Sequence, residues 1–470
     1  MSGEGGFVTA LRSVGCAVLP APRQVELTGE TVHVDGSWRL AGEVAEDGIA
    51  VTTLTARLAG EFSVALGGSG KGGVVGLAVQ AGAVATGASD GIDRQAYRIT
   101  VKPGRIDIVG NGPEGLFYGV QTFLQLLDGD APPGSVPGGD GRERLALPAG
   151  AITDWPAYEL RVVHWDTKHH QDRIETLKRT LDWMARLKFN AVSFELEDKF
   201  AYPSHPVIGA PGAYTPEQMK DLTAYALARY IQIIPNVQAP AHMTYVLKHA
   251  EFAHLRCDGS NYQICMDEPE ARKLIFDMYD DICAATPGVK YFHVSTDEVY
   301  YAGICEKFRQ PYNSANRSLT WVDFVQAAHE HLTARGREVM IWLEFPLLPE
   351  HVKMLPADII DAITTPRKNP GYVAEMDAAG IRRFAYCPIQ GEEYLFPDYF
   401  PGPDGRGRPQ AGRLDDAMRA TRRDGDAANF LGSFVAGWDD AGLHNETFWL
   451  GWAVMAQGGW TAWPDGGPTV

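Results

Sequence analysis

Residues 160–198, LRVVHWDTKHHQDRIETLKRTLDWMARLKFNAVSFELED, carry the pattern that decides the fold. The first run, 160–166, and the last run, 190–198, are largely apolar up to their acidic ends, as expected of parallel strands covered on both faces. Between them, residues 173–188 have the apolar spacing of an amphipathic helix. A strand, a helix and a second strand in this order predict a βαβ unit.

The same pattern recurs along the rest of the chain. Further strand candidates lie at 231–239, 291–299, 338–345, 359–365, 381–388 and 429–438. Further helix candidates lie at 216–230, 270–285, 321–335, 415–424 and 445–460. Eight strands separated by helices predict an α/β fold with a closed (β/α)8 TIM barrel over residues 151–470. An open doubly wound sheet is the alternative, but neither a GxGxxG motif nor a P-loop follows the first strand.

The residues before the barrel have a different composition. Strand candidates with alternating apolar and polar side chains lie at 25–34, 96–102 and 105–110. Residues 115–129 follow with the spacing of a helix. A stretch rich in Pro and Gly, residues 128–150, has the composition of a linker. We therefore expect a small α/β domain, a mixed sheet with a helix, over residues 1–150.

The composition excludes two classes of partner. The 470 residues include 42 Lys and Arg against 59 Asp and Glu, which gives a formal net charge of −17. Without a run of basic residues, a nucleic-acid-binding surface is not expected. Because no stretch approaches about 20 consecutive apolar residues, we expect no membrane-spanning helix.

The N-terminal residues and the cysteines indicate the cellular compartment in which we expect the protein. Residues 1–15 lack the positive start and the long apolar run of a signal peptide, so we expect a cytoplasmic protein. The six cysteines are sparse and show no CxxC spacing, which fits thiols in a reducing compartment. Cys257 and Cys265 could close a small loop, and spacing alone leaves this pairing open. The oligomeric state, a homodimer included, is left open too.

Acidic and aromatic residues gather at the ends of the predicted strands, where barrel enzymes carry their function. These strand ends are His164–Asp166, Glu195–Asp198, Asp297–Glu298, Trp342–Glu344 and Trp438–Asp440, with Asn236 and His242 after the third strand. Carboxylates accept hydrogen bonds from sugar hydroxyls, and aromatic rings pack on the apolar faces of sugars. Acetal hydrolysis also needs a carboxylic acid that protonates the leaving oxygen. The strand ends therefore predict a site for carbohydrate.

These residues also have structural interpretations. Asp297 and Glu298 could stabilise the start of a following helix. His164, His169, His170 and Asp172 could indicate a metal site, but no HExxH or comparable spacing supports this. Three histidines at strand ends, His164, His242 and His293, are the other candidate ligands. We expect neither a metal nor another cofactor.

In their order, these motifs resemble the family-20 glycoside hydrolases, which are β-N-acetylhexosaminidases. HVSTDE, residues 293–298, is similar to the family signature HxGxDE, with Ser295 where glycine is usual. Segments similar to the family's small α/β domain are AVLPAPRQVELTG (17–29), DRQAYRITV (93–101) and GLFYGVQTFLQLL (115–127). Segments that look like its hexosaminidase-D-like branch are ELEDKFAYPSHP (195–206) and GWDDAGLHNETF (437–448).

The resemblance implies the site residues. Asp297 and Glu298 would carry the catalysis, supported by Asp198 and by His242, which ends the family-like PNVQAPAH. Arg161 stands where the family has an arginine that holds the O3 and O4 hydroxyls of the sugar. The other substrate-binding residues expected are Trp342, Glu344, Tyr386, Tyr394, Trp438, Asp439 and Asp440, with Tyr386 and Tyr394 as alternatives for one tyrosine of the family.

The adjacency of Asp297 and Glu298 favours one mechanism. Most retaining glycosidases use two carboxylates about 5 Å apart, one of which is the nucleophile. Two neighbours in sequence cannot approach the anomeric carbon from opposite faces. They suit a substrate-assisted reaction, in which the 2-acetamido group of the sugar is the nucleophile. Asp297 would orient the acetamide, and Glu298 would serve as acid and then as base.

We therefore expect a glycoside hydrolase, an exo-acting β-N-acetylhexosaminidase that releases terminal β-linked GlcNAc or GalNAc from glycans or glycoconjugates. One alternative is a catalytically silent carbohydrate-binding barrel, against which the presence of both Asp297 and Glu298 argues. The other is a metal-dependent barrel hydrolase, which only the three histidines support.

Overall fold

The computed structural model describes residues 10–127, 145–309, 312–363, 370–389, 429–438 and 448–461. Two compact units are distinguished in it, and each is described by itself. The first unit consists of the chain up to Glu159 together with Asp182–Phe189 and the chain from Ala453 onward. The second unit consists of Leu160–Leu181 and Asn190–Trp452.

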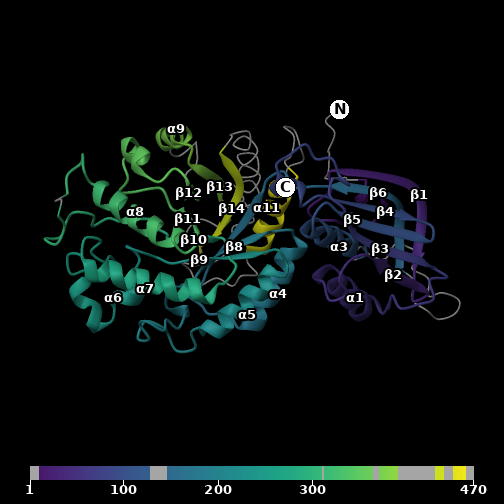
Figure 1. Ribbon diagram of the computed structural model, residues 1–470, viewed down its shortest axis with the longest axis horizontal. Coiled ribbons are helices and arrows are strands. Elements are labelled where there is room, and N and C mark those ends of the chain that lie inside the picture. The colour runs from purple at the N-terminus through teal and green to yellow at the C-terminus, as the bar shows by residue number, and fades with distance from the viewer. Residues whose placement is uncertain are drawn as a thin grey trace, which may run out of the picture. The chain divides into compact units, whose positions relative to one another are not determined.

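The first unit holds a six-stranded mixed sheet (Figure 1). Its strands are β1 (Gln24–Val34), β2 (Trp38–Gly42), β3 (Gly73–Val79), β4 (Tyr97–Lys102), β5 (Arg105–Gly110) and β6 (Leu145–Asp154). They lie in the order β1-β6-β4-β5-β3-β2; β2, β3 and β5 are parallel, and the other pairs are antiparallel. Helix α3 (Pro113–Leu127), buried along most of its length, packs on β3, β4 and β5, and α1 (Ile49–Phe62) packs on α3. The small α/β domain with a mixed sheet is thereby confirmed.

Strand β6 lies in a stretch that the composition predicted to be linker. It pairs with β1 on one side and β4 on the other, so the linker interpretation is wrong over residues 145–150. The first unit also continues to Glu159 rather than ending at 150. Gly150, with a φ of 152°, belongs to this strand for a steric reason: a Cβ there would clash with the carbonyl oxygen of Glu26 on β1.

The second unit is a closed barrel of eight parallel strands, which confirms the predicted fold class (Figure 1). In order around the barrel they are β7 (Leu160–Asp166), β8 (Ala191–Glu195), β9 (Gln232–Asn236), β10 (Tyr291–His293), β11 (Glu338–Ile341), β12 (Ile360–Asp361), β13 (Arg382–Pro388) and β14 (Phe430–Gly437). Each strand pairs with the next, and β14 pairs with β7 to close the ring.

Helices lie between and after these strands. They are α4 (Ile174–Arg186), α5 (Pro216–Leu227), α6 (Thr244–Leu247), α7 (Pro269–Ala285), α8 (Leu319–Thr333), α9 (Pro370–Ala379) and α11 (Trp449–Trp460), with short 3-10 segments η2 (Glu197–Lys199), η3 (Ala250–Leu255) and η4 (Pro349–Met354). Helix α9 was not predicted, and the helix predicted at 415–424 lies outside the described residues. None of the described helices combines the length and the apolar character that crossing a membrane requires.

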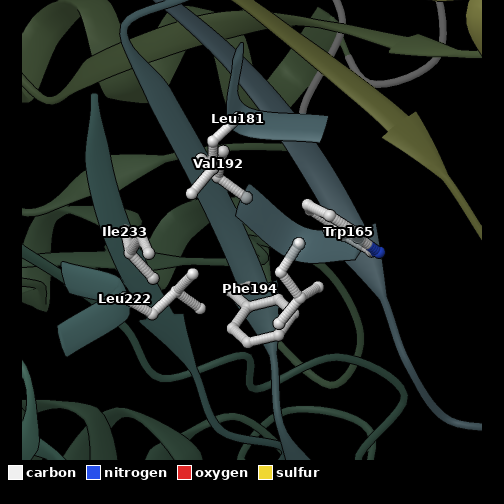
Figure 2. Close-up of a pocket in the computed structure, with 7 residues that line it drawn as sticks. Trp165, Leu181, Val192, Phe194, Leu222 and Ile233 are labelled. Carbon is white, nitrogen blue, oxygen red and sulfur yellow. The ribbon is translucent and has the colours of Figure 1, made fainter. Parts of the chain in front are cut away.

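Alternate residues of β8 face opposite sides of the barrel wall. Val192 and Phe194 line a small apolar pocket between the strands and helices α4 and α5 (Figure 2). The other labelled residues of this pocket are Trp165, Leu181, Leu222 and Ile233. Glu195 therefore belongs to the inner face, where an apolar cluster that includes Ile234 and Phe434 fills the barrel. The pocket is a packing feature of the wall, and the polar chemistry lies inside.

The loop between Cys257 and Cys265 is closed by backbone hydrogen bonds rather than by a disulfide. Cys257 N–H donates to Gln263 O (2.8 Å), and Cys265 N–H donates to Leu255 O (3.0 Å). All six cysteines are free thiols. The nearest sulfur contact of Cys265 is Cys305 Sγ, at 3.7 Å.

Candidate active site

The backbone after β10 has an uncommon conformation. Ser295, Thr296 and Glu298 have φ values of 59°, 78° and 49°. Residues other than glycine rarely adopt this left-handed region, and such residues cluster at functional sites. Neighbouring strand ends hold the turn: Thr296 N–H donates to Ala239 O (3.1 Å), and Trp342 N–H donates to Ser295 O (2.7 Å). The turn explains why β10 ends well before the end of the predicted strand.

The turn places two adjacent carboxyl groups at the carboxyl end of β10. The side chain of Asp297 is 10% exposed, and that of Glu298 is 45% exposed. His242, from the loop after β9, contacts both: its Nε2 lies 3.6 Å from Asp297 Oδ2 and 3.3 Å from Glu298 Oε2. One acid is thus enclosed and the other is open to solvent, and a single imidazole links them.

The surroundings of Asp297 act on its protonation in opposite directions. Burial raises the pKa of Asp297, whereas His242 and a hydrogen bond from Ser295 act to lower it. Ser295 Oγ lies 2.6 Å from Asp297 Oδ1 and 2.5 Å from Gln238 Oε1. The serine at this position, where the resembling signature has glycine, therefore contributes a hydroxyl that fixes the orientation of the Asp297 carboxyl group.

A third carboxyl group lies beside this pair. Glu344, in the loop after β11, accepts a hydrogen bond from Glu298 N–H at 2.9 Å through Oε1. Burial and the neighbouring Asp297 carboxylate raise the pKa of Glu344 to about 7. At neutral pH this group is therefore divided between its neutral and ionised forms.

A second polar cluster lies at the ends of β7 and β8. The buried Glu195 accepts a hydrogen bond from Gln238 Nε2 (2.9 Å) and is paired with His164 Nε2 (2.9 Å). Lys168 Nζ lies 3.6 Å from Glu195 Oε1 and 3.3 Å from Asp166 Oδ2. Burial acts to raise the pKa of Glu195, but Lys168 and His164 outweigh it and hold that pKa well below its ordinary value. Glu195 is therefore a fixed negative charge.

Trp438, directly after β14, lies against this cluster. The ammonium group of Lys168 is 4.6 Å from the centre of a Trp438 ring. Trp438 Nε1 donates to the hydroxyl of Tyr386 on β13 at 2.6 Å. The rings of Trp438 and Trp342 are 5.7 Å apart. Contacts with three neighbours hold the Trp438 indole in one position.

The histidines considered as metal ligands are engaged separately. His164 pairs with Glu195, and His242 lies between the two acids of the turn. His293 packs against Trp342 at 4.3 Å, and burial lowers its pKa to about 3. Within the described ranges, no three His, Cys, Asp or Glu side chains are grouped so as to hold a metal ion.

Comparison with known proteins bears on both units. Residues 15–155 match the description "Glycosyl hydrolase family 20, domain 2", and residues 158–363 match "Glycosyl hydrolase family 20, catalytic domain". Together the two matches span most of the chain. The chain belongs to glycosyl hydrolase family 20.

Relatives of this family-20 chain include Hexosaminidase D of Bos taurus, 32% identical over 184 residues, which are 37% of this chain and 52% of that protein. A beta-hexosaminidase of Porphyromonas gingivalis is 24% identical over 286 residues, 54% of this chain and 36% of that protein. The chain thus spans about half or less of the length of these relatives. One similar solved structure is the family-20 exo-β-N-acetylglucosaminidase of Vibrio harveyi in complex with N-acetylglucosamine. It is 18% identical in sequence, with a TM-score of 0.73, and the match covers 94% of this chain and 73% of that one. This last similarity shows the fold.

Arg161 is not among the site residues of this family-20 barrel. It is the second residue of β7, at the opposite end of the strand from Asp166, and it is fully buried. Its backbone N–H donates to Asn190 Oδ1 at 2.8 Å. The expectation that Arg161 holds sugar hydroxyls is therefore wrong. The cation that does lie among the site residues is Lys168. It was not predicted from the sequence, because the side chain of a lysine in a loop is usually exposed to solvent.

Asp198, expected together with His242 to support the catalytic pair, contacts other groups. Its carboxylate lies 2.6 Å from Lys199 Nζ and 2.8 Å from Lys248 Nζ. Although burial acts to raise the pKa of Asp198, these two lysines hold it below its ordinary value. Besides the two acids, His242 contacts Tyr262, whose hydroxyl lies 3.1 Å from His242 Nε2. The structure thus corrects the expectation for Asp198, and the contact of Tyr262 with His242 was not predicted from the sequence.

Trp342 also differs from its expected role. Its ring is fully buried in the barrel core, so we assign it to packing beneath Trp438 rather than to contact with the sugar. Three further expected residues, Tyr394, Asp439 and Asp440, lie outside the described residues and stay predictions. Tyr386 is the candidate tyrosine that the structure places beside Trp438.

We expect Glu344 to make the stability of the protein depend on pH. The pKa of Glu344 in the folded protein, about 7, lies above the ordinary value of 4.5, so folding favours the protonated form. Its contribution to the free energy of unfolding is therefore fully present below pH 4.5 and is lost as the pH rises to about 7. Thermal unfolding across this window should show a falling Tm, and a smaller fall in Glu344→Gln. The same fall in both proteins would contradict the assignment.

Proposed function

We propose that this chain is an exo-acting β-N-acetylhexosaminidase that releases terminal β-linked GlcNAc or GalNAc from glycans and glycoconjugates, with retention and with substrate assistance. The observation that carries the proposal is the turn after β10, which presents Asp297 and Glu298 side by side with His242 against both. Two carboxyl groups that are adjacent in sequence can approach only one face of a sugar ring. Attack on the other face must then come from the substrate itself. The names of its relatives, β-hexosaminidases, agree with this reaction.

In the first step, the carbonyl oxygen of the substrate's 2-acetamido group attacks the anomeric carbon. The bond to the leaving oxygen breaks, and Glu298 gives its proton to that oxygen. Asp297 accepts the acetamide N–H, which orients the carbonyl and stabilises the positive charge of the oxazolinium ion as it forms. The half-exposed Glu298 is the one of the two acids that a leaving group can reach.

In the second step, water attacks the anomeric carbon from the side that the leaving group has vacated. The Glu298 carboxylate takes a proton from this water, the bond to the acetamide oxygen breaks, and the acetamide is restored. Two inversions give net retention. His242, whose Nε2 lies 3.6 Å from Asp297 Oδ2, acts to lower the pKa of Asp297 and so favours the ionised state that Asp297 needs throughout.

The neighbouring cluster would bind the sugar in position. The indole of Trp438, held by Tyr386 and Lys168, offers a flat surface for the apolar face of the pyranose. Glu344 is an acceptor for sugar hydroxyls at the rim of the same site. We expect Lys168 to fix the position of Trp438 through its pairing with Glu195.

The test compares two substrates that differ only at C2. The enzyme should hydrolyse p-nitrophenyl N-acetyl-β-glucosaminide and leave p-nitrophenyl β-glucoside essentially untouched, because the glucoside lacks the nucleophile. Proton NMR of the first product should show the β-anomer. Labelling of Glu197 or Glu344 by a 2-deoxy-2-fluoro glucoside would show that the protein supplies its own nucleophile, and would overturn the proposal.

A further inference from the structure

Three aromatic rings lie together beside the turn after β10. Tyr300, only two residues after Glu298, is 48% exposed and is among the most exposed large hydrophobic residues that the structure describes. Its ring is stacked on Tyr262, with ring centres 6.2 Å apart and planes inclined by 17°. On another side it lies 5.5 Å from the ring of Phe345. We call Tyr262, Tyr300 and Phe345 the aromatic platform; its members come from the loops after β9, β10 and β11.

The aromatic platform is attached to the backbone of the proton donor. Tyr300 N–H donates to Glu298 O at 2.7 Å, and the Tyr262 hydroxyl donates to the same oxygen at 3.1 Å. Val299 N–H donates to Phe345 O at 3.4 Å. Burial and the nearby Glu298 carboxylate raise the pKa of Tyr300 to about 12, so its hydroxyl stays protonated in the working range. The position of the platform is therefore fixed relative to Glu298.

This attachment says which part of a substrate the platform meets. A general acid must lie within hydrogen-bond distance of the oxygen that it protonates. That oxygen joins the released sugar to the leaving group, so the first ring of the leaving group lies next to Glu298. An exposed tyrosine ring at that place gains by covering the C–H face of a pyranose, because both surfaces then leave water.

We propose that the aromatic platform binds the leaving group, and that it selects substrates in which the terminal N-acetylhexosamine is linked to another sugar ring. The inference rests on the proposed function, since it takes Glu298 as the proton donor. Tyr300 supplies the contact face. Tyr262 and Phe345 hold its ring, and the guanidinium group of Arg317, 5.0 Å from the Phe345 ring, supports Phe345 from outside.

The experiment measures kcat/KM on N,N′-diacetylchitobiose and on methyl N-acetyl-β-glucosaminide. Both substrates expel an alkoxide, so they make similar demands on the acid, and only the disaccharide has a ring for the platform. The readout is the ratio of the two kcat/KM values. In Tyr300→Ala this ratio should fall about tenfold. In Tyr300→Phe, which keeps the ring and loses the hydroxyl near Glu298, the ratio should stay within about twofold of the wild-type value even where both rates fall.

Tyr312→Ala is the matched control. Tyr312 is 45% exposed and follows in the same loop, where its N–H donates to Gly303 O at 2.7 Å. It should leave the ratio unchanged. Should Tyr300→Ala fail to fold, as judged by thermal unfolding, Tyr300→Leu makes the same test with a side chain of closer volume.

Two results would overturn the inference. An unchanged ratio in Tyr300→Ala, or in its Leu substitute, means that the ring does not meet the leaving group. An equal loss of the ratio in Tyr300→Phe means that the hydroxyl, and not the ring, carries the preference. Absence of turnover of both sugars by the wild-type enzyme is a separate outcome, since it would overturn the proposed function itself and the inference with it.

Discussion

Glu298→Gln should remain folded and lose turnover on N,N′-diacetylchitobiose by about 10²–10⁴-fold, the range that general acid–base catalysis contributes. The amide has the shape of the acid but no proton to give to the leaving oxygen. Because the Glu298 side chain is 45% exposed, the substitution disturbs little packing. Steady-state kcat and thermal unfolding of the same preparation measure the two expectations.

The control for Glu298→Gln is a substrate that does not need the acid. A 2,4-dinitrophenyl N-acetyl-β-glucosaminide releases a stable phenolate, so its cleavage step should be affected far less than that of the disaccharide. Near wild-type turnover of the disaccharide by the variant would show that another group is the proton donor.

Asp297→Asn should lower kcat by about 10²–10³-fold, the range seen when one stabilising group is removed from a developing charge. KM should change much less, because the charge that Asp297 stabilises is present in the transition state and absent from the bound substrate. A thiazoline that mimics the bicyclic intermediate should accordingly inhibit the wild type strongly and the variant weakly. Steady-state kinetics and inhibition constants give both quantities.

Asp221→Asn is the matched substitution for Asp297→Asn. Asp221 is an exposed residue of α5 that pairs with Lys178 on α4, so its replacement should leave kcat and KM unchanged. If Asp297→Asn raised KM as strongly as it lowered kcat, Asp297 would serve binding in general, and its role as a clamp for the charged intermediate would be wrong.

The sequence predicted the barrel because its strands differ from its helices in period. The role of Arg161, however, was assigned from the order of the family motifs, and that order does not show at which end of a strand a residue lies. Arg161 and Asp166 are five residues apart, which is about 16 Å along an extended strand, so they cannot serve one site. Counting along the strand would have excluded Arg161. Counting would also have assigned Glu195, named among the strand ends, to the inner face, since Val192 and Phe194 face the helices and a residue in the opposite phase faces the inside.

Other parts of the site left no signal in the sequence. Lys168 and Tyr262 lie in loops, and only the closed barrel brings them against Glu195 and His242. The raised pKa of Glu344 depends on burial and on a carboxylate 47 positions away along the chain, so no local pattern reports it. These features arise from contacts between loops that are distant in sequence. The two acids, in contrast, are adjacent in one short motif, which can be recognised from the sequence.

The left-handed turn after β10 constrains how this enzyme could acquire a new specificity. Asp297 and Glu298 share one backbone segment, and partners after two other strands, β9 and β11, hold it. A substitution that moves one acid moves the other, so the two roles proposed for them, proton donation and acetamide recognition, cannot change independently by small steps. A descendant that cleaves 2-hydroxy sugars would have to recruit a nucleophile from a different strand while leaving the turn alone. Under the proposed mechanism, the route to such an activity therefore passes through the far side of the sugar, from which the substrate's own acetamide attacks.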